Sequence, residues 1–191
     1  HIKIYQLNGS TWTQLGSDIA GTHSFGYLGQ SVSINGDGTI VAAAAPQANS
    51  GRSVVRIYQY SNNSWTQLGS DIAGEANNNE IGYHDSLSLS SDGTIVAFGA
   101  YGGNSYAGWT KLYQWNGSAW VQLGAKIVGE TGGDMSGWSV SLSDDGTRVA
   151  IGAYKNEDGW DSSHTASDRR AGQVRVYEIG SITPAAYQDY N

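Results

Sequence analysis

The chain has 191 residues, of which 39% are hydrophobic, so it can bury one sizeable core. Its formal net charge of −7 and isoelectric point of 4.8 disfavour an anionic membrane surface and make nucleic acid an unlikely partner. The absence of cysteine excludes disulfides, thiolate catalysis and cysteine-based zinc sites. No apolar run approaches the roughly 20 residues that span a bilayer, so we expect no membrane insertion.

One phrase occurs three times along the chain. It reads NGSTWTQLGSDIAG from Asn8, SNNSWTQLGSDIAG from Ser61 and NGSAWVQLGAKIVG from Asn116. The aligned asparagines, Asn8, Asn62 and Asn116, are spaced 54 residues apart. A fixed period of this kind is typical of a repeat architecture. We therefore divide the chain into four units, which span residues 1–21, 22–74, 75–129 and 130–191.

Each unit begins with two stretches that predict strands joined by a turn. The first alternates apolar and polar residues, which is typical of a strand with one apolar face: SVSI (31–34), SLSL (86–89) and SVSL (139–142). An Asp-Gly pair follows each one and predicts a tight hairpin. The second stretch is rich in small and β-branched residues, which predicts a strand covered on both faces: TIVAAAA (39–45), TIVAFGA (94–100) and TRVAIGA (147–153).

Two further elements complete the unit. The third alternates again, with its Lys or Arg expected to point to water: IKIYQL (2–7), VRIYQY (55–60), TKLYQW (110–115) and QVRVYE (173–178). The fourth is the repeated phrase itself, in which Trp and Gln-Leu-Gly precede an Ile that begins the link to the next unit. Unit 1 lacks the first two elements and unit 4 lacks the fourth.

The pattern predicts an all-β fold of thirteen strands with almost no helix. Four-stranded antiparallel units of about this length are typical of the blades of a β-propeller, of which about three and a quarter are present. A β-solenoid is the structural alternative, but its strands are parallel, whereas Asp-Gly hairpins favour antiparallel meanders. Such a row cannot close into a ring. We expect a longer parent chain, or else another copy or protein, to supply the missing blades.

The unit sequence resembles the FG-GAP repeat of integrin α-type β-propellers. The stretches SVSINGDGTIVAAAAP and SVSLSDDGTRVAIGA carry this resemblance over nearly the whole chain. FGY (25–27), IGY (81–83) and SGW (136–138) stand where the Phe-Gly half of the motif falls, and Ala45-Pro46 matches the end of the Gly-Ala-Pro half. The resemblance implies a propeller and a link to adhesion proteins.

The resemblance also implies a calcium loop around each Asp-Gly pair, but the ligand residues are missing. The matching positions hold Ser33, Asn35, Asp37 and Val41, then Ser88, Ser90, Asp92 and Val96, then Ser141, Ser143, Asp145 and Val149. Calcium takes about six to eight oxygen ligands, and each loop offers a single carboxylate. We therefore predict hairpin turns, with no metal and no cofactor.

No set of residues indicates catalysis, so we predict that the chain is not an enzyme. The sequences after Gly29 and Gly137 approach the G-x-S-x-G elbow, but they lack its final Gly and their serines lie on alternating strands. Four histidines fall at unrelated repeat positions and are interpreted as surface or loop residues: His1, His23, His84 and His164. The long loop 155–172 holds several acidic residues without the spacing of a metal site and is interpreted as a solvated insertion.

Two sets of residues are candidates for interaction. Tryptophans 12, 65 and 120 recur at one repeat position and are interpreted as packing residues between blades. The irregular aromatic residues in or near variable loops are the candidate ligand-binding set: Tyr101, Tyr106, Trp109, Trp138, Tyr154 and Trp160. Asn8, Asn62 and Asn116 each begin an N-x-S sequon on a predicted exposed turn, so they are candidate glycosylation sites, although Asn-Gly is also a favoured turn pair.

These features lead to three hypotheses for function. The leading one is a non-enzymatic extracellular or cell-surface module for adhesion or structural assembly, completed by a protein partner or by the rest of a parent chain. The second is a carbohydrate-binding lectin that uses the loop aromatics. The third is part of an enzyme whose site lies on blades outside this chain.

Overall fold

The computed structural model describes residues 1–21, 26–49, 52–77, 81–157 and 171–180. The described regular structure is entirely antiparallel β-sheet. Among the described residues there is no helix of the length and apolar character needed to cross a membrane. Trp160, Phe25, His23 and His164 lie outside the described residues.

Four sheets follow one another along the chain, and we name them blades 1 to 4. Blade 1 pairs β1 (Tyr5–Asn8) with β2 (Thr11–Gln14). Blade 2 has the order β3 (Val32–Ile34), β4 (Ile40–Asn49), β5 (Arg52–Ser61) and β6 (Ser64–Gln67). Blade 3 repeats that order with β8 (Leu87–Leu89), β9 (Ile95–Ala100), β10 (Trp109–Trp115) and β11 (Trp120–Gln122). Blade 4 contains β13 (Ser136–Leu142), β14 (Arg148–Ala153) and β15 (Gln173–Glu178).

The predicted all-β fold of four-stranded antiparallel units is confirmed, with two additional strands. These are β7 (Ile72–Asn77), which pairs with β5, and β12 (Ile127–Val128), which pairs with β10. They bring the described strands to fifteen instead of the thirteen expected. The segment that begins at this Ile was expected only to link two units. Instead it forms a strand that pairs with the third strand of its own blade.

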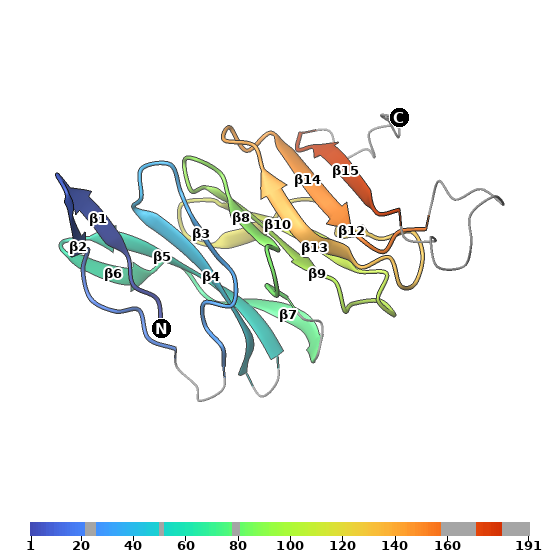
Figure 1. The fold of residues 1–191 in the computed structure, drawn as a ribbon, viewed down its shortest axis with the longest axis horizontal. Helices are drawn as coiled ribbons and strands as arrows, with labels where there is room; N and C mark the ends of the chain where they lie inside the picture. Colours follow the sequence, from blue (N-terminus) through green and yellow to red (C-terminus); the bar gives the residue numbers. More distant parts are fainter. Residues whose placement is uncertain (22–25, 50–51, 78–80, 158–170, 181–191) are drawn as a thin grey trace.

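The sheets lie side by side in chain order, from β1 and β2 at one end to β15 at the other (Figure 1). One apolar core lies between blades 2 and 3, where Ile57, Leu89 and Phe98 are buried together. A second core lies between blades 3 and 4, around Leu112, Val140 and Ile151. Residues 42–45, four consecutive alanines, are fully or almost fully buried, which confirms the prediction of a strand covered on both faces.

The prediction that the Lys or Arg of the third strand points to water is wrong for blades 2 to 4, including Arg175 of blade 4, whose side chain is 16% exposed and pairs with Glu130. Arg56 is 5% exposed and Lys111 9% exposed. Arg56 donates two hydrogen bonds to the Asp71 carboxylate, at 2.9 and 2.8 Å. Both faces of a propeller blade are covered by neighbours, so alternation along a strand does not identify a solvent face. Only Lys3, on the incomplete blade 1, is exposed as expected.

Candidate functional site

Five side chains form a continuous aromatic cluster at one end of blades 3 and 4. We call Tyr83, His84, Tyr101, Trp138 and Tyr154 the rim cluster. The His84 ring stacks on Trp138 with centroids 3.7 Å apart, and Tyr154 and Tyr101 approach Trp138 to 4.4 and 4.7 Å. Tyr83 joins through Tyr101 at 6.4 Å in an edge-on arrangement. Tyr154 and His84 are exposed, so the cluster faces solvent.

Each ring of the rim cluster is positioned by the end of a strand. Tyr83 and His84 precede β8, Tyr101 directly follows β9, Trp138 lies in β13 and Tyr154 directly follows β14. His84 has a φ of +56°, a conformation that few residues other than glycine adopt. The turn at His84 directs its ring across to the neighbouring blade, where it stacks on Trp138.

The structure brings together three of the six predicted ligand-binding aromatics, namely Tyr101, Trp138 and Tyr154. Tyr106 is exposed, but it makes no ring contact within the described part of the chain. Trp109 is 2% exposed and packs against Phe98 in the core, so it offers no surface to a ligand. Tyr83 and His84 were not among the predicted ligand-binding residues, although the IGYH segment that contains them stands at the position of the Phe-Gly motif.

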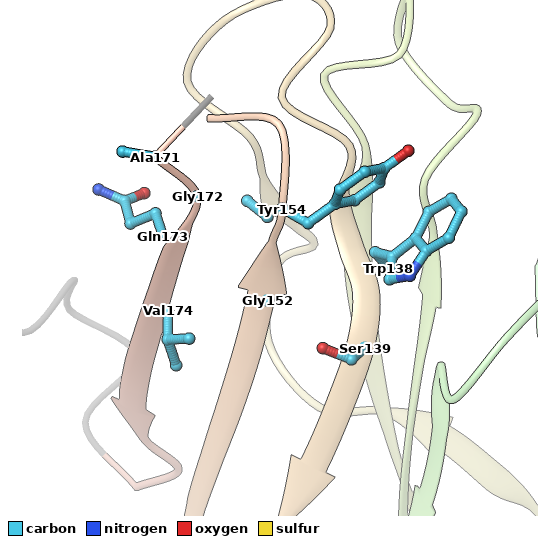
Figure 2. A pocket seen from close by; sticks show the side chains of 9 residues that line it. Trp138, Ser139, Gly152, Tyr154, Ala171, Gly172, Gln173 and Val174 are labelled. Atoms are coloured by element: carbon cyan, nitrogen blue, oxygen red, sulfur yellow. The ribbon is translucent and has the colours of Figure 1, made fainter. Parts of the chain in front are cut away.

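A cavity of about 330 Å³ adjoins the rim cluster on the outer face of blade 4. Trp138 and Tyr154 lie at one side of it, and Ser139, Gly152 and Val174 line the rest (Figure 2). Gln173 also lines this cavity, although its Oε1 atom is buried. The cavity therefore combines an aromatic side with small residues of the neighbouring strands.

The recurring tryptophans act in packing between blades, as predicted, where a preceding blade is present. Trp65 Nε1 donates to the Leu15 carbonyl of blade 1 at 2.8 Å, and Trp120 Nε1 donates to the Leu68 carbonyl of blade 2 at 2.9 Å. Trp12 holds the same position in blade 1 and is 66% exposed. This position therefore links each blade to the one before it.

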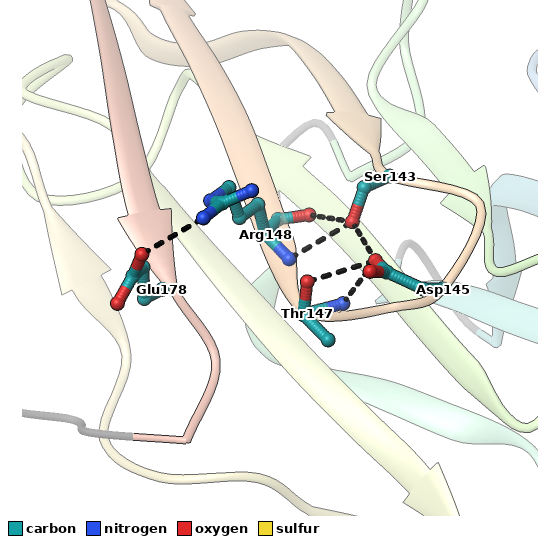
Figure 3. Close-up of polar contacts among 5 residues, drawn as sticks. All are labelled: Ser143, Asp145, Thr147, Arg148 and Glu178. Carbon is teal, nitrogen blue, oxygen red and sulfur yellow. Dashed lines mark hydrogen bonds and ion pairs between the residues drawn. The ribbon is translucent and has the colours of Figure 1, made fainter.

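The Asp-Gly turns are held by hydrogen bonds to the aspartate. Figure 3 shows the turn of blade 4, where Asp145 Oδ1 accepts bonds from the Ser143 hydroxyl at 2.6 Å and from the Thr147 amide at 3.0 Å. The hydrogen bond from Ser143, with those from Thr147, lowers the pKa of Asp145 to about 2. Arg148 next to this turn pairs with Glu178 at 3.1 Å.

The equivalent turns of blades 2 and 3 have the same design. Thr39 lowers the pKa of Asp37 through side-chain and backbone hydrogen bonds. Partial burial raises the pKa of Asp92, but hydrogen bonds from Ser90 and Thr94 lower it by more. The turns are longer than two-residue hairpin loops. In blade 2, the backbone amide of Asn35 donates a hydrogen bond to the Ile40 carbonyl, which leaves residues 36–39 in the loop. Across the described residues, no three His, Asp or Glu side chains come close enough to hold a metal ion.

The sequons lie on exposed turns. The Asn116 side chain accepts hydrogen bonds from the amides of Ser118 and Ala119, at 3.0 and 2.9 Å. Asn62 has a φ of +51°, and Gly9 and Gly117 follow Asn8 and Asn116 with positive φ. These geometries fit turn residues, and glycosylation stays a prediction. Of the long loop 155–172, residues 158–170 lie outside the described part of the chain.

Comparison with known proteins gives similarity in fold alone. No protein-family model matches the chain, and no curated protein sequence matches it. Among solved structures, TolB from Acinetobacter baumannii superposes with a TM-score of 0.50 at 15% identity, over 94% of this chain and 36% of TolB. The β-propeller domain of the trilobed protease from Pyrococcus furiosus gives 0.47 at 12% identity, over 82% of this chain and 40% of the other.

A structure of prolyl endopeptidases gives a TM-score of 0.48 at 18% identity, over 92% of this chain and 24% of that one. The chain thus spans less than half the length of each of these proteins. The successive four-stranded antiparallel sheets and the similarity to TolB lead to one conclusion: the chain has the fold of β-propeller blades.

Proposed function

We propose that this chain is a non-enzymatic β-propeller module of the FG-GAP type, which acts outside the cell or on its surface in adhesion or structural assembly. The observation that carries the proposal is the exposure of blade-packing side chains at both ends of the row. Apolar side chains that face water in this way mark interaction surfaces.

Equivalent residues show the contrast at the first end. Ile34 on β3 is 51% exposed, whereas Leu89 at the same position of β8 is 7% exposed beneath blade 2. At the other end, Val174 on β15 is 72% exposed, whereas Thr110 at the same position of β10 is fully buried. Both open faces therefore carry side chains at positions that are buried between blades elsewhere in the row.

The partner in this proposal is the rest of a longer parent chain, or a second protein, that completes the propeller. Sedimentation of the full chain over a range of concentrations tests the role in assembly. We expect self-association or aggregation at high concentration, because the open faces are apolar. The double variant Ile34→Asp, Val176→Asp should abolish it. A compact monomer at every concentration would count against the proposal.

Support for an extracellular location is the polar surface and the sequons on exposed turns. If the turns are modified, protein from a secretory host should exceed its sequence mass by the mass of a glycan. The Asn62→Gln variant should lose one of these increments. An unmodified mass at all three sequons would remove this support.

A second candidate function, carbohydrate binding, is favoured by the rim cluster. Exposed aromatic rings beside hydrogen-bonding groups stack on the apolar faces of sugars. A glycan array should show binding by the full chain that is lost in Trp138→Ala and kept in Trp12→Ala, which removes an exposed tryptophan of blade 1. An array with no binding at all would set this function aside. The enzymatic alternative, with a site on other blades, requires activity measurements on a longer parent protein.

A further inference from the structure

The cavity on the outer face of blade 4 has filled counterparts inside the protein. In the repeat, Gly152, Gln173 and Val174 are equivalent to Gly99, Trp109 and Thr110 of blade 3. In blade 3, the space beside these three residues is filled by Gly137 of blade 4. A Cβ atom added to Gly137 would lie 2.7 Å from the Trp109 carbonyl oxygen, 3.0 Å from Gly99 Cα and 3.1 Å from Thr110 Oγ1. The fit leaves no room for a larger residue.

The contact between blades 2 and 3 is built in the same way. Gly82 of blade 3 packs on Ala44, the blade 2 equivalent of Gly99 and Gly152, and a Cβ atom on Gly82 would overlap that of Ala44. In both internal contacts, a glycine just before or at the start of the first strand of a blade lies against a small residue on the second strand of the blade before it. The cavity at Gly152 is the third copy of this arrangement, and it is open.

Hydrogen bonds between blades follow the same period. Ser33 Oγ accepts a bond from the Leu89 amide, and Ser88 Oγ accepts one from the Leu142 amide, both at 3.0 Å. The equivalent hydroxyl on blade 4 belongs to Ser141, which is exposed. Ser91 donates its amide hydrogen to the Asp144 carbonyl at 2.8 Å, just as Gly36 donates to Ser91 at 2.9 Å. The Asp144 amide continues this series at the outer turn of blade 4.

We propose that the cavity at Gly152 is a docking slot for a further blade of the same repeat, carried by the same polypeptide. This inference rests on the proposed role in assembly. The incoming blade places the glycine of a Gly-aromatic pair, as in IGY (81–83) and SGW (136–138), over Gly152. Its first strand donates an amide hydrogen to Ser141 Oγ, and its turn accepts one from the Asp144 amide. The incoming strands cover Val174 and Val176, as blade 4 covers Thr110 and Leu112.

The test appends to the full chain a flexible Gly/Ser linker of about 20 residues, which spans about 25 Å, and then a copy of residues 75–102. This copy contains Gly82 and the first two strands of blade 3 but no tryptophan. The chain has no cysteine, so Val176→Cys introduces a single thiol on the open face. The rate at which a maleimide labels this thiol reports whether the face is covered.

We expect the appended copy to slow labelling at least tenfold. Gly82→Val in the copy alone should restore fast labelling, since the slot accepts no side chain there. In the main chain, Gly152→Leu should also restore it, whereas Gly152→Ala should keep the protection, because Ala44 already receives Gly82 in the internal contact. The Gly152→Ala and Gly152→Leu proteins should melt within a few degrees of each other, which separates blocked docking from unfolding.

Equal labelling with and without the copy, or equal protection by the Gly82→Val copy, would overturn the docking slot. Protection by an excess of the unmodified chain without a tether would identify a second copy as the occupant and would also overturn it. Failure of the docking slot can be told apart from failure of the proposed function. Sedimentation detects any association of the open faces, whereas thiol labelling detects only a blade that covers Val176 in the arrangement proposed above.

Discussion

The middle of the row of blades and its two ends use the same residues in opposite environments. Leu89 is buried between blades 2 and 3, while its equivalent Ile34 faces water. Gly99 lies beneath Gly137, while its equivalent Gly152 lines an open cavity. The repeat therefore specifies which residues pack between blades, and whether a blade is present on the other side decides their exposure.

The charged residues follow the same division. Arg56 and Asp71 form a pair in blade 2 whose side chains are largely buried, whereas Lys3 and Asp18 make the equivalent pair in blade 1 at 3.4 Å with both side chains well exposed. Blade 3 departs from this design. Lys126 stands at the position of Asp71, and Lys111 lies 5.3 Å from the centre of the Trp109 ring. At the second end, Arg175 of blade 4 pairs with Glu130 and its side chain is only 16% exposed, so for the ion pairs the contrast in burial is between blade 2 and blade 1.

The largest expected contrast comes from truncating the equivalent apolar residues. Leu89→Ala should lower the free energy of unfolding by about 3 kcal/mol, because it leaves a cavity in the core between blades 2 and 3. Ile34→Ala should cost less than about 1 kcal/mol, because that side chain is half exposed. Urea denaturation of both variants provides the measurement. Equal losses would mean that the first end is covered in solution.

Removing one partner of each ion pair sharpens the electrostatic side of the comparison. Asp71→Ala should cost about 2 to 3 kcal/mol, because it leaves the buried Arg56 guanidinium without its carboxylate. Asp18→Ala should change stability by less than about 1 kcal/mol, as is usual for exposed pairs. Thermal denaturation at low and high salt distinguishes them. The Asp18 effect should decline with salt, and a large, salt-insensitive effect at Asp18 would contradict the comparison.

Gly99 and Gly152 stand at equivalent positions in the closed and the open slot, so substitutions at these two residues compare the two forms. Gly99→Ala should cost about 2 kcal/mol, since the added methyl group would overlap the Gly137 carbonyl, which is backbone and cannot rotate away. Gly152→Ala should be close to neutral, because the added methyl group meets only the exposed hydroxyl of Ser139. Chemical denaturation again gives the result. A neutral Gly99→Ala would show that blades 3 and 4 separate easily.

The sequence predicts the strands well because each one carries a local signal. Alternation identifies β3 and β8, and the Asp-Gly pairs mark the turns that follow them. The strands β7 and β12 have no such signal, since they depend on pairing with the third strand of their own blade. Burial of Arg56 was missed for a related reason. Both faces of β5 are covered, so neither of the two alternating sets of side chains on this strand faces water.

The candidate site was predicted in part because its aromatic residues lie in or near the loops between strands. Tyr101, Trp138 and Tyr154 were found in that way, and Tyr101 and Tyr154 stand at the same repeat position, directly after β9 and β14. Trp109 begins β10, and its ring packs in the core beside Phe98. His84 joins the rim cluster only through contact with the neighbouring blade, which the sequence of a single unit does not reveal.

A smaller contrast is expected at the recurring tryptophans. Trp120→Phe should cost about 1 kcal/mol through loss of the hydrogen bond to the Leu68 carbonyl. Trp12→Phe should have almost no effect, because the Trp12 ring faces water at the first end of the row. Differential scanning calorimetry resolves such differences. A substantial loss at Trp12 would indicate that blade 1 is covered in the protein as purified.

The smallest effect concerns the turn at the second end of the row, and it depends on pH. The hydrogen bonds from Ser143 and Thr147 hold the pKa of Asp145 at about 2, below its ordinary value of 3.8, so the folded state favours the carboxylate. The resulting stabilisation is complete above about pH 4 and is lost as the pH falls towards 2.

An asparagine in place of Asp145 still accepts hydrogen bonds but does not titrate. Asp145→Asn should therefore flatten the acid dependence of the melting temperature between pH 4 and 2. Asp92→Asn should do the same at the turn of blade 3, so an effect at only one of the two turns would show that the ends and the middle of the row also differ in their turns.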